Sequence, residues 1–310
     1  MGLKLLLVAV LAFTTITTIV LFGDSPSLRG SAVARARLRL IQILLQGVTA
    51  YERLNNRTNG RLGWSLGYVV PAFYLGLISI CLHLFFTVSY PELPSHITNS
   101  TLHLIAIHVS IATVYFSFAI LTFSDPGYIV LERTASRAQE LQPYNNIIFF
   151  LGKECYTCRY PKPARLKHCL VCDRCVALYD HHCVWVNNCI GFYNYRWFLA
   201  FLFANIVFLS YGFYICFSAL QQQTAYGNWW RRIAYSNEAN KTTGVFLIFC
   251  AIFLPVVTIF TGFQIRYIYL GVTTNECEKW SEIEYLIDVG SLYEVEEQDI
   301  LSEPYLERVL

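Results

Sequence analysis

The feature that most constrains this chain is a cluster of metal-binding side chains between residues 155 and 189. These positions hold seven of the eleven cysteines and three of the seven histidines in the 310-residue sequence. A tetrahedral zinc site takes four such side chains, so two closed sites would use eight of these ten. One cysteine and one histidine would remain, and a thiol beside an imidazole is the minimal arrangement for nucleophilic catalysis. The cluster therefore predicts a zinc-built scaffold that carries a reactive cysteine.

The segment that contains the cluster lacks the pattern of an ordinary domain. From Glu154 to Tyr193 neither helical nor strand periodicity is sustained, and turn-forming residues and metal ligands dominate. Structural zinc in small peptides contributes about 10–16 kcal/mol of apparent binding free energy. Zinc would therefore supply much of the free energy that folds this segment.

Long apolar runs flank the cluster in a chain that is 55% hydrophobic and only 14% charged. Five runs lie at residues 3–22, 66–90, 102–123, 197–220 and 244–270. Each has about twenty residues, enough to cross a hydrocarbon core of about 30 Å as a helix. We expect an all-α polytopic membrane protein with about five transmembrane helices and a small cytosolic cysteine-rich domain that binds two zinc ions.

The first run has a competing interpretation as a cleaved signal peptide. It is longer than a usual signal core, and no Ala-x-Ala site precedes Asp24, so an uncleaved anchor over residues 1–23 is favoured. Only Lys4 lies before this run, whereas seven arginines follow it between residues 24 and 64. The positive-inside rule then places the N-terminus outside and the basic loop 24–65 in the cytosol. Within that loop, residues 38–48 fit either a surface-lying amphipathic helix or a solvated segment.

Alternating crossings fix the remaining segments. Helices two and three occupy 66–124, the cytosolic zinc domain 125–196, helices four and five 197–270, and an acidic cytosolic tail 271–310. The connections near residues 90–101 and 221–243 would be lumenal, in agreement with sequons at Asn99 and Asn240. Because cytosolic thiols stay reduced, the clustered cysteines are expected to be ligands or catalytic groups rather than disulfides.

Isolated polar and thiol groups in the spans have simpler interpretations. Cys81, Cys216 and Cys250 are expected to be small buried apolar residues. His103 is expected to be a hydrogen-bonded structural histidine, and Asn205 to join helices. Cys277 follows the last span and is interpreted in the same way, with a lipid-modification site as the alternative.

Several motifs together resemble the DHHC protein S-acyltransferase family. The cluster follows the order Cys-x2-Cys-x3-Lys-Pro-x-Arg-x2-His-Cys-x2-Cys-x2-Cys from Cys155, then Asp-His-His-Cys ending at Cys183. Further matches are Asn188-Cys189-Ile190-Gly191, Asn194, Asp125-Pro126-Gly127 and Thr273-Thr274-Asn275-Glu276. The resemblance covers roughly residues 66–276. Val184 stands where many members have proline, which resembles a branch whose fungal and animal members tend to reside in the endoplasmic reticulum, or in the Golgi.

The resemblance implies a metal-ligand set that spacing alone leaves open. One zinc would be held by Cys155, Cys158, His168 and Cys175, and the other by Cys169, Cys172, His182 and Cys189. A sequential pairing of the same ligands is equally compatible with the spacing. The interleaved sets leave Cys183 as nucleophile, His181 as its base and Asp180 as the group that orients the base.

The activity implied is protein S-palmitoyl transfer in two thioester-exchange steps. A fatty acyl group from acyl-CoA would pass to Cys183 and then to a cytosolic cysteine of a membrane-associated substrate protein. The acyl tail would lie between helices, and Arg159, Lys162, Arg165 and Lys167 are candidates for the CoA phosphates, although basic residues also favour anionic headgroups.

The competing interpretation is a non-catalytic membrane zinc scaffold in which Cys183 is only a ligand. A nucleic-acid-binding zinc finger is disfavoured, since the cluster lacks the helix-borne Cys2His2 pattern and is tied to spans on both sides.

Overall fold

A computed structural model of the chain describes residues 66–129, 148–150, 152–222, 227–234 and 237–290, with a few positions between 35 and 46. The predicted first span, most of the segment 38–48 and the tail beyond residue 290 lie outside the described residues. The chain divides into two units after Tyr68. All further description concerns the second unit, Val69–Leu310.

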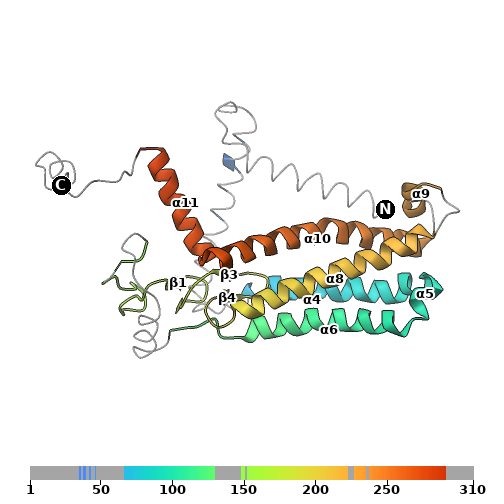
Figure 1. Cartoon of the computed structure of the whole chain (residues 1–310), viewed down its shortest axis with the longest axis horizontal. Helices are drawn as coiled ribbons and strands as arrows, with labels where there is room; N and C mark the ends of the chain where they lie inside the picture. The colour runs from blue at the N-terminus through green and yellow to red at the C-terminus, as the bar shows by residue number, and fades with distance from the viewer. Residues whose placement is uncertain are drawn as a thin grey trace, which may run out of the picture. The chain divides into compact units, whose positions relative to one another are not determined.

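Four long helices form the body of this unit and lie side by side (Figure 1). They are α4 (Val69–Leu84), α6 (Thr101–Phe123), α8 (Tyr195–Gln221) and α10 (Glu238–Leu270). A π turn (Phe85–Ser89) and a 3-10 turn (Tyr90–Glu92) extend α4. Each of the four is long and apolar enough to cross a membrane, which confirms the last four predicted spans.

The connection predicted at 221–243 is shorter than expected. It contains the short helix α9 (Trp229–Ala234), and α10 already begins at Glu238 because the Asn237 side chain accepts a hydrogen bond from the Asn240 backbone N–H at 2.9 Å. Asn240 is therefore buried within the first turn of a helix rather than displayed on a loop. This position is unfavourable for glycosylation of that sequon.

Polar side chains join the helices inside the bundle. The Tyr74 hydroxyl donates to Asn205 Oδ1 at 2.9 Å, which links α4 to α8. His103 Nδ1 lies 2.7 Å from the Tyr211 hydroxyl, which links α6 to α8. Such interhelical hydrogen bonds replace contacts with water that the bilayer cannot provide. They confirm the roles expected for Asn205 and His103.

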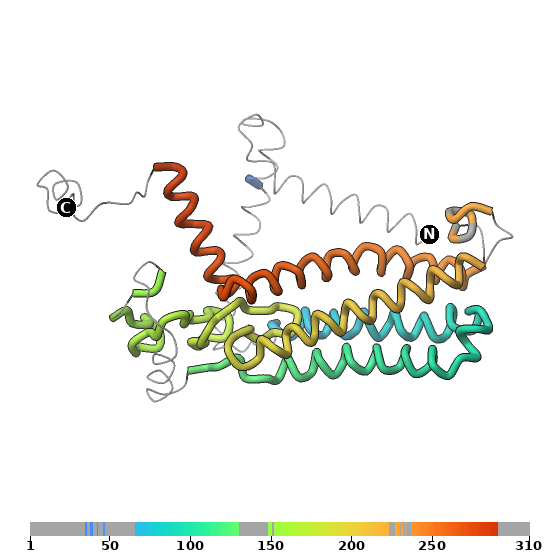
Figure 2. The backbone as a smooth tube through the Cα atoms, in the orientation of Figure 1, coloured from blue at the N-terminus to red at the C-terminus, as the bar shows by residue number. Residues whose placement is uncertain are grey.

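A small cysteine-rich module, residues 152–194, lies where α6 ends and α8 begins (Figure 2). Its first antiparallel hairpin pairs β1 (Lys167–Cys169) with β2 (Arg174–Val176), and its second pairs β3 (His181–Cys183) with β4 (Asn188–Ile190). The short helix α5 (Ser95–Thr98) and α9 lie at the other end of the bundle. The helix α11 (Thr274–Asp288) follows α10 at the module's end.

The module is fastened to the helices through a shared apolar core and through the Asp-Pro-Gly turn. Val186 and Ile190 pack in one buried cluster with Leu121 of α6 and Phe198 of α8. After α6 ends, Asp125 Oδ1 accepts the backbone N–H groups of Gly127 and Tyr128 at 2.8 and 3.0 Å. This Asx turn confirms that the motif ends a helix, and it leads the chain into pairing with β2.

Candidate active site and metal centres

The module gathers eight cysteine and histidine side chains into two groups, each of which can hold a metal ion. In each group the ligand atoms lie within 4.8 Å of one another. The groups are Cys155, Cys158, His168 and Cys175, and Cys169, Cys172, His182 and Cys189. The structure thus brings together the interleaved sets and not the sequential ones.

The hairpin register explains this interleaving. His168 on β1 pairs with Cys175 on β2, and His182 on β3 pairs with Cys189 on β4, so each pair supplies two ligands of one group. Successive side chains of a strand point to opposite faces. Cys169 therefore leaves the face that His168 occupies and joins the second group.

The distances within the groups fit zinc. Bond lengths of about 2.3 Å to sulfur and 2.0 Å to nitrogen place the ligand atoms of a tetrahedral ion about 3.5–3.8 Å apart. His168 Nδ1 lies 3.4 and 3.7 Å from the sulfurs of Cys158 and Cys175. His182 Nδ1 lies 3.4–3.8 Å from three sulfurs. Each group is a Cys3His set, a usual donor set of structural zinc.

The same strand alternation separates the reactive residues from the ligands. His181 and Cys183 lie two positions apart on β3 and share one face, while His182 between them points to the metal group on the other face. Cys183 is 5% exposed and lines a cavity together with His181. A ligated His182 and Cys189 would hold the strand that carries the thiol.

Asp180 is placed to orient His181. Its carboxylate is 1% exposed, and Oδ2 lies 2.6 Å from His181 Nδ1. Burial lowers the pKa of His181, but the interactions with Asp180 and Cys183 outweigh it and raise that pKa to about 9. A protonated imidazole beside the Cys183 thiol would stabilise its thiolate form.

The Thr-Thr-x-Glu segment at the start of α11 holds the Asp180 carboxylate in place through hydrogen bonds. Thr274 donates its backbone N–H to Asp180 Oδ1 at 2.7 Å and its hydroxyl to Oδ2 at 2.9 Å. Glu276 forms a capping box with Thr273 and a two-point ion pair with Arg165 at 2.5 and 2.7 Å. The sequence indicated that this segment could contact the module, but not that its partner is the triad carboxylate.

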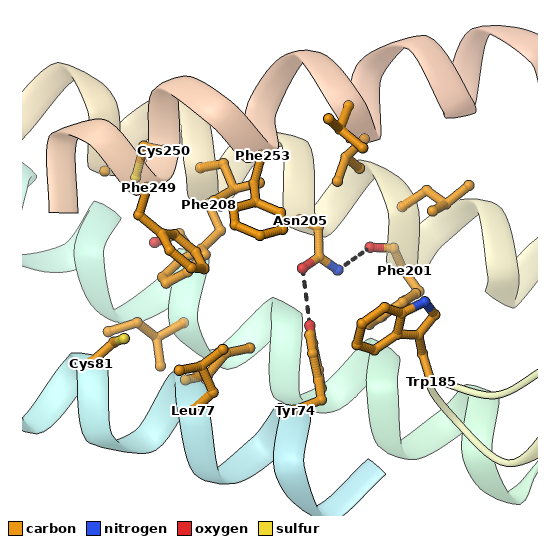
Figure 3. A pocket seen from close by; sticks show the side chains of 18 of the residues that line it. Tyr74, Leu77, Cys81, Trp185, Phe201, Asn205, Phe208, Phe249, Cys250 and Phe253 are labelled. Carbon is orange, nitrogen blue, oxygen red and sulfur yellow. Dashed lines mark hydrogen bonds between the residues drawn. The ribbon is translucent and has the colours of Figure 1, made fainter. Parts of the chain in front are cut away.

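An apolar cavity of about 760 Å³ runs from Cys183 between the helices (Figure 3). A volume of 300–1,000 Å³ is typical of pockets that bury a small ligand. Aromatic side chains, including Trp185 and Phe253, line it near the polar Tyr74–Asn205 pair. Small residues also line it, among them Cys250, which lies at the opposite end of the view from Trp185 (Figure 3), and Gly212, which lies beside Cys250. The aromatic-rich lining fits a long hydrocarbon chain.

The basic residues expected to contact the CoA phosphates differ in their partners and exposure. Arg165 is engaged by Glu276, and Lys167 Nζ donates to Asn275 Oδ1 at 2.6 Å. Arg159 is exposed, at a positive φ of 58° that follows the first Cys-x2-Cys. Lys279 of α11, which no sequence motif indicated, lies near Lys162 and Lys167, and burial together with these two charges lowers its pKa. These lysines therefore form one cationic cluster.

Fold and site together define a polytopic membrane protein in which a module able to hold two metal ions presents a thiol and an imidazole to an apolar cavity, with a buried carboxylate bound to the imidazole. A family model for DHHC palmitoyltransferases matches residues 148–281. The chain is 41% identical over 303 residues to "Palmitoyltransferase SWF1" of Debaryomyces hansenii, covering 96% of this chain and 80% of the relative. With the protein of the same name in Candida albicans it shares 43% over 296 residues, covering 95% and 80%. The chain belongs to the DHHC palmitoyltransferase family and is a protein S-acyltransferase.

Proposed function

We propose that the palmitoyl transfer proceeds through a covalent thioester on Cys183. The main support is that His181 and Cys183 share one face of β3, that Asp180 contacts the His181 imidazole, and that Cys183 lines the cavity. The Cys183 thiolate attacks the carbonyl carbon of an acyl-CoA thioester, and the bond from that carbon to the CoA sulfur breaks. The proton held by His181 passes to the departing CoA thiolate. In the second step the neutral His181 takes the proton of a substrate cysteine thiol, and the resulting thiolate attacks the carbonyl carbon of the Cys183 thioester. The bond from that carbon to the Cys183 sulfur breaks, which restores the Cys183 thiolate beside a protonated His181.

Two structural zinc ions would complete the module. The distances within both Cys3His groups support this. Zinc would supply folding free energy and hold β1–β4 in register. The chemistry itself would remain with Asp180, His181 and Cys183.

Acyl-CoA would bind across the boundary between the bundle and the module. The hydrocarbon tail would fill the cavity, and the phosphates would meet the cationic cluster of Lys162, Lys167 and Lys279. Arg159 is exposed and would assist. Arg165, held by Glu276, would contribute mainly by fixing α11 against the module.

We also propose an orientation in the membrane. The module, with its reduced thiols and basic residues, would face the cytosol, and the connections around α5 and α9 would face the lumen. Substrates would be membrane-associated proteins whose cysteines lie in the cytosol close to the bilayer. We place the protein in the endoplasmic reticulum membrane, or the Golgi, on the basis of Val184 after the nucleophile. Fluorescence imaging of the tagged chain against markers of both compartments tests this.

Self-acylation of purified protein with labelled palmitoyl-CoA tests the mechanism. The label should be released by hydroxylamine and absent from Cys183→Ser, while zinc stays at about two ions per chain. Cys277→Ser is the matched control, because it removes a thiol outside the cluster and should keep the label. Loss of zinc from Cys183→Ser would instead assign that cysteine as a ligand, and label on that variant would exclude it as the nucleophile.

A further inference from the structure

Asn188 lies on β4 directly opposite Cys183 on β3, and it belongs neither to a metal group nor to the triad. Its side chain is buried, and the two N–H donors of its amide point to the end of α6. Nδ2 donates to the backbone carbonyls of Leu121 and Ser124 at 2.9 and 2.8 Å. Oδ1 accepts a hydrogen bond from the Tyr128 hydroxyl at 3.3 Å. Both donors of the amide are thus used on the end of α6.

These carbonyls belong to the last turn of a transmembrane helix. The final C=O groups of any helix lack intrahelical partners and need donors from elsewhere. Here the donor comes from a residue 67 positions away, so the cap of α6 is also a fastening between that helix and the β3–β4 hairpin. Ser124 is the last residue before the Asp-Pro-Gly turn, where the chain leaves the helix.

Cys189, the next residue on β4, is held in a different way. Cys189 belongs to the second metal group, so metal binding ties β4 to the module, whereas Asn188 ties it to the bundle. Helices α4, α6, α8 and α10 wall the cavity, and Cys183 lies at its module end. The hydrogen bonds of Asn188 therefore relate the position of the thiol to the helices that would hold the acyl chain.

We propose that Asn188 is a positioning residue that sets Cys183 in register with the acyl cavity. This rests on the proposed role of Cys183 as the acyl acceptor. Without the amide the module keeps its metal ligands and triad, but the thiol is no longer held at the depth where a long chain places its carbonyl carbon. A long acyl group is fixed by the cavity and cannot follow a displaced thiol. A short acyl group is not fixed by the cavity, so its carbonyl carbon can still reach a displaced thiol.

The test compares three reactions of Asn188→Ala and Asn188→Asp with those of the wild type. The reactions are self-acylation by palmitoyl-CoA, self-acylation by butyryl-CoA, and alkylation of Cys183 by iodoacetamide. Asn188→Asp keeps the shape of the side chain and the acceptor for Tyr128 but removes both donors. Tyr128→Phe is the matched control, because it removes the third hydrogen bond of Asn188 and leaves both amide donors on α6.

Both Asn188 variants should lose palmitoyl transfer by about 100-fold, the size expected when a reacting group is misplaced by about 1 Å. Their butyryl transfer should fall much less, and alkylation of Cys183 should stay close to the wild-type rate. Tyr128→Phe should keep the wild-type ratio of palmitoyl to butyryl transfer.

Four results would overturn the proposal. Equal losses of palmitoyl and butyryl transfer, or a parallel loss of alkylation, would mean that Asn188 acts on the thiol itself. Loss of zinc from both variants would mean that it holds the fold of the module. Wild-type rates throughout would mean that Asn188 has no such role. The Cys183 mechanism has its own test in wild type and Cys183→Ser, so it can stand when this inference fails.

Discussion

Thr274 connects α11 to the proposed active site through two hydrogen bonds to the Asp180 carboxylate, one from its backbone and one from its hydroxyl. Thr274→Val removes the hydroxyl bond to Asp180 and a longer one that the hydroxyl accepts from Gln264 Nε2 at 3.4 Å, and it keeps the backbone bond and the shape of the side chain. A hydrogen bond to a charged group contributes about 1.5–3 kcal/mol. Asp180 is buried, so water does not replace the lost donor.

If that bond holds Asp180 in the geometry that orients His181, its loss raises the barrier to thioester formation. A tenfold change in rate corresponds to about 1.4 kcal/mol, so single-turnover self-acylation should slow by roughly 10- to 100-fold. Alkylation of Cys183 should slow as well, because the imidazole beside the thiol loses its support. Zinc content should be unchanged, since no ligand is touched.

Thr258→Val is the matched control, because the hydroxyl of Thr258 bonds only to the Leu254 carbonyl within α10. It should retain the wild-type rate. If Thr274→Val acylates as fast as Thr258→Val, the reasoning is refuted, and the backbone N–H of Thr274 alone suffices to hold Asp180.

Three further predictions concern the module and the cavity. Gly191→Ala would place a Cβ 2.6 Å from the Pro126 carbonyl oxygen and 2.7 Å from Val176 Cγ1. It should therefore destabilise the module by about 1–3 kcal/mol, measured as a lower temperature of zinc release. An unchanged temperature would contradict this. Gly212→Leu would fill the cavity beside Cys250 Sγ, which lies 3.3 Å from an added Cβ. It should shift the preference of the enzyme toward acyl-CoA with shorter acyl chains in a competition assay. An unshifted preference would show that the acyl chain does not reach Gly212. A strong chelator should remove both metals and abolish self-acylation, with zinc assayed in parallel; activity in metal-free protein would contradict a structural role for zinc.

The sequence alone predicted the features that depend on consecutive residues or on intrinsic chemistry. Apolar length is a local sum, so the last four spans were predicted to within a few residues except where Asn237 starts α10 early. Thiol and imidazole groups are metal ligands wherever they lie, so two metal groups with one spare cysteine and one spare histidine followed from counting, whereas Cys183 was named as the spare cysteine only through the family resemblance. The motif Asp125-Pro126-Gly127 ends a helix through its own turn chemistry.

The remaining features depended on which distant residues the fold brings together. Spacing permitted two pairings of the metal ligands, and the hairpin register that places His168 opposite Cys175 decided between them. Nothing near Asp180 in the sequence indicated Thr274, which lies 94 positions away, or that Asn188 would cap α6. The cavity exists only where helices from separate parts of the chain converge. Local chemistry therefore determined which groups are available to react. Tertiary structure determined which of these groups meet, because the thiol, the carboxylate and the cavity are brought together by contacts between distant segments and not by any one segment.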